Sequence, residues 1–101
     1  MQIPKKLRIG AFAIPIVWVP DLELDGEACN GTWCSRNLEI KLDPAINSQH
    51  QASTFLHEII HAILWTTGIT HILPEDTEEN IVAALSCGLY QVLKDNKLIF
   101  N

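Results

Sequence analysis

The chain has 101 residues, of which 48% are hydrophobic and 19% charged, so we expect one globular domain spanning residues 1–101. Its formal net charge of −5 excludes nucleic-acid binding that depends on neutralising the phosphate backbone. The apolar stretch at residues 9–19 is interrupted by Gly10 and Pro15, is too short to cross a bilayer and precedes no secretory cleavage site. We therefore expect a cytoplasmic protein that binds neither nucleic acid nor membranes and keeps its three cysteines as thiols.

Three strand candidates fill the N-terminal half of the chain. Residues 7–19 are rich in β-branched and aromatic side chains, and Pro15 favours an edge strand or a bulge because proline cannot donate to the ladder. Residues 27–34 are the second candidate, although the turn pair Asn30 and Gly31 favours a bend or a small hairpin there. Residues 38–42 alternate apolar and charged side chains, which predicts a half-buried strand with three inward residues: Leu38, Ile40 and Leu42.

Two helices are predicted in the C-terminal half. The first spans about residues 48–67, with Asn47 or Ser48 as its N-cap and Gly68 just beyond its C-terminus. The second spans about residues 76–95, and its apolar residues at helical spacing are expected to be buried: Ile81, Val82, Leu85, Leu89, Val92 and Leu93. The predicted fold is α+β, with a small three-stranded, mostly antiparallel N-terminal sheet packed on the first helix and on the C-terminal helix.

The first helix carries the pattern His-Glu-x-x-His at residues 57–61. Histidines four residues apart project from one helix face, where two imidazoles can hold one Zn²⁺ at roughly 2.0–2.1 Å. Glu58 follows His57 about 100° round the helix, so it can flank the metal and accept a proton from water. The longer pattern with a glycine and a third histidine is excluded, because Leu64 and Thr67 occupy those positions.

A catalytic zinc usually has three protein ligands, so a third ligand must come from elsewhere in the chain. The candidates are Glu79, which we favour, Glu78 and His71. Glu79 shares a helix face with the small residues Ala83 and Ser86, which would let the two helices approach closely. Acidic residues in the first turn of a helix are also stabilised by its dipole, and this effect alone explains one of the two glutamates.

The chain resembles the compact zinc metallopeptidases of bacteriophages and prophages, which are similar to the ImmA/IrrE-type and other gluzincin-like minimal peptidases. The resemblance covers about residues 22–96, and its specific part is the motif at residues 57–61. The sequence Gly-Leu-Tyr-Gln-Val-Leu-Lys-Asp-Asn at residues 88–96 adds to it. One departure is that ImmA-type chains carry Ala-Asn-x-Phe-Ala after the glutamate, whereas residues 83–85 here are Ala-Ala-Leu. This departure weakens the transfer of a repressor-cleaving role.

The resemblance implies a minimal zincin-like fold in which His57, His61 and a glutamate of the last helix bind zinc, with Glu58 as the general base. On this interpretation the protein is a zinc-dependent peptidase that hydrolyses a peptide or protein substrate with a water activated by Zn²⁺. Two other interpretations stay open at the level of sequence. The protein could be a zinc-stabilised interaction module without turnover, such as a phage antirepressor, or a structural domain in which the histidine pair is incidental.

Two further sets of residues are candidates for contacts with the substrate. Residues 38–42 are expected at an exposed sheet edge beside the motif helix, where an extended peptide could pair with the strand that carries Leu38, Ile40 and Leu42. The candidates for stabilising an oxyanion are His50, His71 and Tyr90. Tyr90 is disfavoured, because it lies roughly 16 Å beyond Glu79 along the predicted helix.

Overall fold

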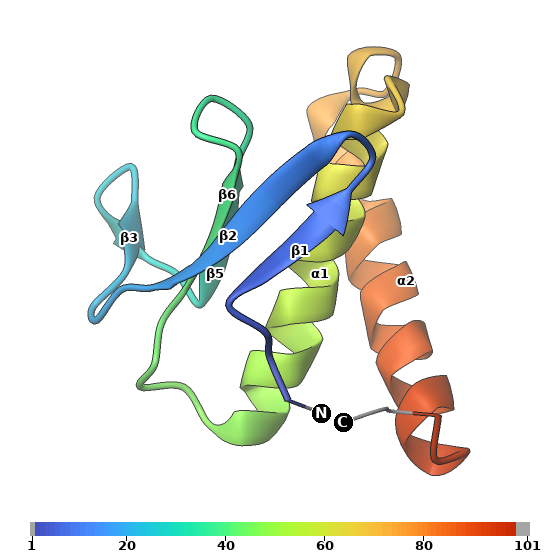
Figure 1. The fold of residues 1–101 in the computed structure, drawn as a ribbon. Coiled ribbons are helices and arrows are strands. Elements are labelled where there is room, and N and C mark those ends of the chain that lie inside the picture. Colours follow the sequence, from blue (N-terminus) through green and yellow to red (C-terminus); the bar gives the residue numbers. More distant parts are fainter. Residues whose placement is uncertain (1, 99–101) are drawn as a thin grey trace.

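A four-stranded sheet packs on the long helix α1, and helix α2 lies along another side of α1 (Figure 1). The computed structural model describes residues 2–98, so Met1 and residues 99–101 of the expected domain lie outside the described residues. The strands are β1 (Lys6–Ile9), β2 (Phe12–Trp18), β3 (Glu23–Leu24), β4 (Glu27–Ala28), β5 (Gly31–Cys34) and β6 (Glu39–Leu42). The helices are α1 (Ser48–Thr66), the 3₁₀ helix η1 (Ile69–His71) and α2 (Glu75–Asp95). The predicted α+β class is confirmed.

The sheet has the strand order β1-β2-β6-β5 and therefore one strand more than the three predicted. Residues 7–19 do not form one strand but a hairpin, in which Ile9 pairs with Phe12 and Gly10 turns the chain with a φ of +58°. The first arm alternates charged and apolar residues and the second is apolar throughout, and the Gly-Ala pair between them is not a strong turn signal. Pro15 pairs with β1 and stands just before the parallel pairing with β6, which begins at Ile16. The lack of an N–H at Pro15 therefore costs the sheet no hydrogen bond to β6.

The predicted substrate-binding edge at residues 38–42 is wrong. Strand β6 lies in the middle of the sheet, parallel to β2 on one side and antiparallel to β5 on the other. Ile40 and Leu42 are fully buried as predicted, whereas Leu38 precedes the strand with a φ of +52° and is half-buried. The bend at Asn30 separates the small β3–β4 hairpin from β5, and β5 then pairs with β6. Strand β5 is therefore the edge of the sheet next to α1.

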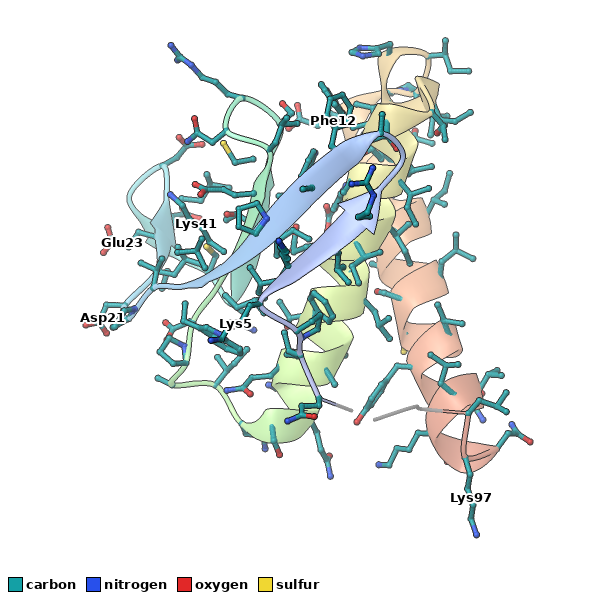
Figure 2. The ribbon with its side chains drawn as sticks, viewed as in Figure 1. Lys5, Phe12, Asp21, Glu23, Lys41 and Lys97 are labelled. Carbon is teal, nitrogen blue, oxygen red and sulfur yellow. The ribbon has the colours of Figure 1, made fainter. Side chains whose placement is uncertain are left out.

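The core lies between the sheet and α1 and is made of apolar side chains from both: Ile9, Ile14, Ile16, Ile40, Leu42, Phe55 and Ala62. Figure 2 shows Phe12 close to α1, where its ring lies 5.9 Å from that of Trp65. Asp21 and Glu23 project from the loop around β3, away from both helices (Figure 2). Burial of this one layer of apolar residues fixes how α1 lies under the sheet, and hence which face of α1 is left for α2.

The predicted bounds of α1 agree with the structure because both caps are local. The side chain of Asn47 accepts hydrogen bonds from the amides of Gln49 and His50 at 2.9 and 3.1 Å. Gly68 follows the last turn with a φ of +84°, a left-handed conformation that glycine adopts without the penalty of a Cβ. Within residues 2–98, no helix is long and apolar enough to cross a membrane.

The apolar stripe predicted to be buried on α2 is mostly exposed. Of its six residues, Val82 is fully buried and Leu93 is half-buried, while four are 39–55% exposed: Ile81, Leu85, Leu89 and Val92. Helix α2 packs mainly on α1, and α1 touches only the narrow face of α2 that carries its buried residues, Glu78, Val82 and Ser86. Helical spacing identified an apolar face correctly but could not show whether another element covers it.

The contrast between Val82 and Leu85 yields a stability prediction. We expect Val82→Ala to lower the free energy of unfolding by about 1–3 kcal/mol, because it opens a cavity at the α1–α2 contact. Leu85→Ala, at a side chain that is 55% exposed, should cost less than about 0.5 kcal/mol. Urea unfolding of both variants tests this. A similar large loss in Leu85→Ala would mean that the exposed face of α2 is covered in solution.

Candidate metal centre

Helix α1 presents the three polar residues of the motif at the place where β5 and α2 meet its surface. The rings of His57 and His61 lie one turn apart with their centroids separated by 5.0 Å. Both rings are partly exposed, whereas Glu58 is 94% buried between α1 and β5. The spacing of the sequence motif thus brings its two imidazoles together on the face of α1 that α2 approaches.

Glu79 on α2 completes a group of three metal-ligating side chains with His57 and His61. Its Oε1 lies 2.9 Å from His57 Nε2 and its Oε2 lies 2.8 Å from His61 Nε2. One ligand atom from each of the three residues lies within 4.8 Å of the others. Two imidazole nitrogens and one carboxylate oxygen are a donor set that zinc accepts in catalytic sites, so the residues present fit a Zn²⁺ ion.

Glu78, the alternative third ligand, has a different role in the structure. Its Oε2 accepts a hydrogen bond from His61 Nδ1 at 2.7 Å, and its side chain is almost buried. A carboxylate on the second nitrogen of a histidine holds the ring in the tautomer that leaves the first nitrogen free for a metal. Glu79 therefore faces the proposed metal and Glu78 stands behind His61.

Ser86 is a site residue that the sequence analysis considered only for its small size. Its Oγ lies 3.5 Å from His57 Nδ1 and donates to the carbonyl of Ala83 at 3.3 Å. Ser86 is 4% exposed and stands two helical turns after Glu79, so the two side chains share one face of α2. Each motif histidine therefore has one contact with Glu79 and a second polar contact on its other nitrogen.

Burial controls the ionisation of Glu58. The pKa of its carboxyl is raised from the ordinary value of 4.5 to about 7, chiefly by desolvation and in smaller part by the charge of Glu79. The neighbouring His61 and the backbone of Trp33 on β5 partly oppose this rise. A carboxyl whose pKa lies near neutral pH is suited to take up a proton and release it again within one reaction.

The two histidines have opposite shifts. Burial lowers the pKa of His57; the charge of Glu79 and its hydrogen bond oppose this lowering and the adjacent His61 adds to it, so the pKa stays below its ordinary value. Burial also lowers the pKa of His61, but its hydrogen bonds to Glu78 and Glu79 and the charge of Glu58 outweigh it, so the pKa rises. In the metal-free protein His61 therefore holds its proton more strongly than His57, and a metal must displace that proton to bind.

Two hollows border the site, one on each side of His57 and Glu58. The first has a volume of about 430 Å³ and extends between α1 and α2 as far as Tyr90. The second has a volume of about 410 Å³ and lies over β5, His61 and the acidic start of α2. Tyr90, disfavoured from its distance along the helix, thus shares a hollow with Glu58, because α1 runs alongside α2 and brings the motif toward it.

The remaining sequence candidates lie elsewhere. His71 is exposed in η1 and His50 is exposed in the first turn of α1. Among the described residues, neither belongs to the group of metal-ligating side chains, and the same holds for Cys29 and Cys34. Each of the three cysteines is a free thiol, as expected.

Comparison with known proteins adds no relative. No family model, curated protein or solved structure matches the chain. The expected relationship to phage and prophage peptidases therefore stays a prediction from the sequence.

Proposed function

We propose that the protein is a zinc-dependent peptidase, with His57, His61 and Glu79 as the metal ligands and Glu58 as the general base. The observation that carries this proposal is the buried Glu58 carboxyl, with a pKa of about 7, beside a group of three metal-ligating side chains. Burying an ionisable group at a cost to stability is typical of catalytic sites rather than of structural metal sites. The two adjoining hollows supply space for a polypeptide on either side of the site.

Each residue of the site has a separate role in the proposed reaction. A bound Zn²⁺ would supply a Lewis acid for the scissile carbonyl and a water whose pKa is lowered to about 7. Glu58 takes a proton from the attacking water and delivers it to the departing amine nitrogen, so the carboxyl returns to its starting state. Glu78 and Ser86 hold His61 and His57 in the orientation that directs their Nε2 atoms toward Glu79.

Strand β5 replaces β6 as the candidate for pairing with the substrate. It is an edge strand of the sheet, and Thr32 and Trp33 line the same hollow as Glu58 and His61. An extended peptide added to this edge would run past Glu58, with its backbone held by hydrogen bonds that are independent of its sequence. Such an arrangement suits a peptidase, which must hold a chain in one register across the site.

Metal content and peptide cleavage test the proposal together. Elemental analysis of the purified protein is expected to find about one zinc per chain, and the protein should cleave an unfolded protein substrate such as casein. Removing the metal with a chelator should abolish cleavage, and adding zinc back should restore it. A chain that binds no zinc after reconstitution, or a zinc-loaded chain that cuts no peptide, would contradict the proposal.

The exposed apolar face of α2 favours a second function, a zinc-stabilised interaction module without turnover. In that case zinc would raise the melting temperature, but no peptide would be cut. Under either function we propose a cytoplasmic location, which the free cysteines support because a reducing compartment preserves thiols. The phage or prophage relationship and a peptide or protein partner are part of the same proposal.

A further inference from the structure

The hollow between α1 and α2 is built differently from the one over the acidic start of α2. It is bordered by α1 on one side, by α2 on another and by the beginning of β5, and it opens to solvent. Apart from His57 and Glu58, its walls carry small or uncharged side chains: Asn30, Ser53, Thr54, Ser86, Cys87 and Tyr90. The opposite hollow contains three glutamates of α2, namely Glu75, Glu78 and Glu79. A bound peptide would therefore meet a mostly uncharged surface on one side of the site and an acidic surface on the other.

The wall made by β5 and α1 is tightly closed. A Cβ atom on Gly31 would lie 2.6 Å from Thr54 Cγ2 and 3.0 Å from Leu42 Cδ2, so only glycine permits this approach of the strand to the helix. Gly31, His57 and Glu58 line both hollows. A chain that pairs with β5 would therefore pass directly from one hollow to the other over the proposed base.

The uncharged lining determines what the first hollow can accept. An acidic side chain placed there would be partly desolvated and would meet the charge of Glu58, with no lysine or arginine among the lining residues to compensate it. A basic side chain could pair only with Glu58, and that ion pair would prevent Glu58 from accepting the proton of the attacking water. An aromatic or long aliphatic side chain needs no charged partner, and a volume of about 430 Å³ is ample for it.

We propose that the hollow between α1 and α2 is a specificity pocket that binds a large uncharged side chain of the peptide substrate, next to the bond that is cut. This inference rests on the proposed peptidase function and names the substrate class of that same site. Tyr90 and Cys87 on α2 and Ser53 on α1 form the part of the pocket that lies away from the metal ligands. These residues select the side chain without taking part in the reaction.

The test measures binding and cleavage separately. Zinc-loaded Glu58→Gln protein, which holds substrate without cutting it, is titrated by NMR with acetyl-Ala-Ala-Xaa-Ala-Ala-amide, where Xaa is Phe, Ala, Lys or Glu. The Phe peptide should bind at least about tenfold more tightly than the other three. Adding Cys87→Leu, which fills the pocket from an exposed position, should remove that preference. Ala84→Leu introduces the same side chain at an exposed position of α2 outside the pocket and should leave the preference unchanged.

Cleavage by the protein with Glu58 intact is then mapped on a peptide library, and large uncharged residues should dominate one position beside the cut. Equal affinity for all four peptides, no binding at all, or a preference for Lys or Glu would overturn the pocket, whether or not peptides are cut. A preference for Phe that Cys87→Leu does not reduce would also overturn it. A Phe preference lost in Cys87→Leu, with no cleavage of the library, would support the pocket and overturn the peptidase function.

Discussion

Replacing Glu58 by glutamine is expected to abolish peptide cleavage and, at the same time, to stabilise the metal-free protein. The amide can neither accept the proton of the attacking water nor return it to the amine, so turnover should fall by about 10²–10⁴-fold. Zinc content should be unchanged, because Glu58 is not among the three proposed ligands. The two effects have one cause, the burial of an ionisable carboxyl where catalysis needs it.

The gain in stability should depend on pH. The pKa of Glu58 is raised in the folded protein, from 4.5 to about 7, so the folded state binds the proton more tightly than the unfolded state. Below about pH 4.5 both states are protonated and Glu58 costs nothing; as pH rises toward 7 the cost grows to about 3 kcal/mol, and it is complete above pH 7. Urea unfolding of metal-free wild type and Glu58→Gln at pH 4.5 and pH 8 should show this divergence.

Glu75→Gln provides the matched control. Glu75 lines the same hollow over β5 but is exposed at the first residue of α2. Because its side chain is exposed, its substitution should change the free energy of unfolding by less than about 0.5 kcal/mol at either pH. Full activity in Glu58→Gln would exclude Glu58 as the base. Equal stability of metal-free wild type and Glu58→Gln at pH 8 would contradict the proposed cost of burying the Glu58 carboxylate.

The sequence predicted those parts of the fold that depend on neighbouring residues. Asn47 and Gly68 delimit α1 because capping is a local matter of one side chain and one backbone conformation. The turn at Gly10 was missed because it carries no Asn-Gly or Asp-Gly pair, the strong local signals of a hairpin. The central place of β6 depends on its parallel pairing with β2, a long-range choice that no local pattern in residues 38–42 expresses.

In the candidate site, too, relations within one helix could be predicted and relations between helices could not. His57 and His61 were predicted because their relation is internal to one helix. The separate roles of Glu78 and Glu79 depend on how α2 is rotated against α1, which a sequence with two adjacent glutamates leaves open. Ser86 was placed on the face of Glu79 from its spacing, but its contact with His57 depends on the same rotation of α2. The rotation of α2 also explains why Val82 is buried and Leu85 is not.

Substituting the two glutamates in turn should separate the proposed ligand from the residue that orients it. Glu79→Gln removes a charged donor that lies within 2.9 Å of both imidazoles, so zinc affinity should fall by more than 100-fold. Glu78→Gln keeps the shape of a buried side chain behind His61 but replaces the carboxylate with a neutral amide. Its expected loss of zinc affinity is about 10–100-fold. Competition with a zinc chelator of known affinity measures both.

His61→Ala completes the comparison, because it removes a residue that contacts both glutamates. It should lose zinc at least as completely as Glu79→Gln, and the increase in melting temperature on adding zinc should disappear. A merely structural role for Glu78 would lower the melting temperature of the metal-free protein while leaving zinc affinity unchanged. If Glu78→Gln instead loses zinc more completely than Glu79→Gln, Glu78 is the third ligand, and α2 must turn on α1 when the metal binds.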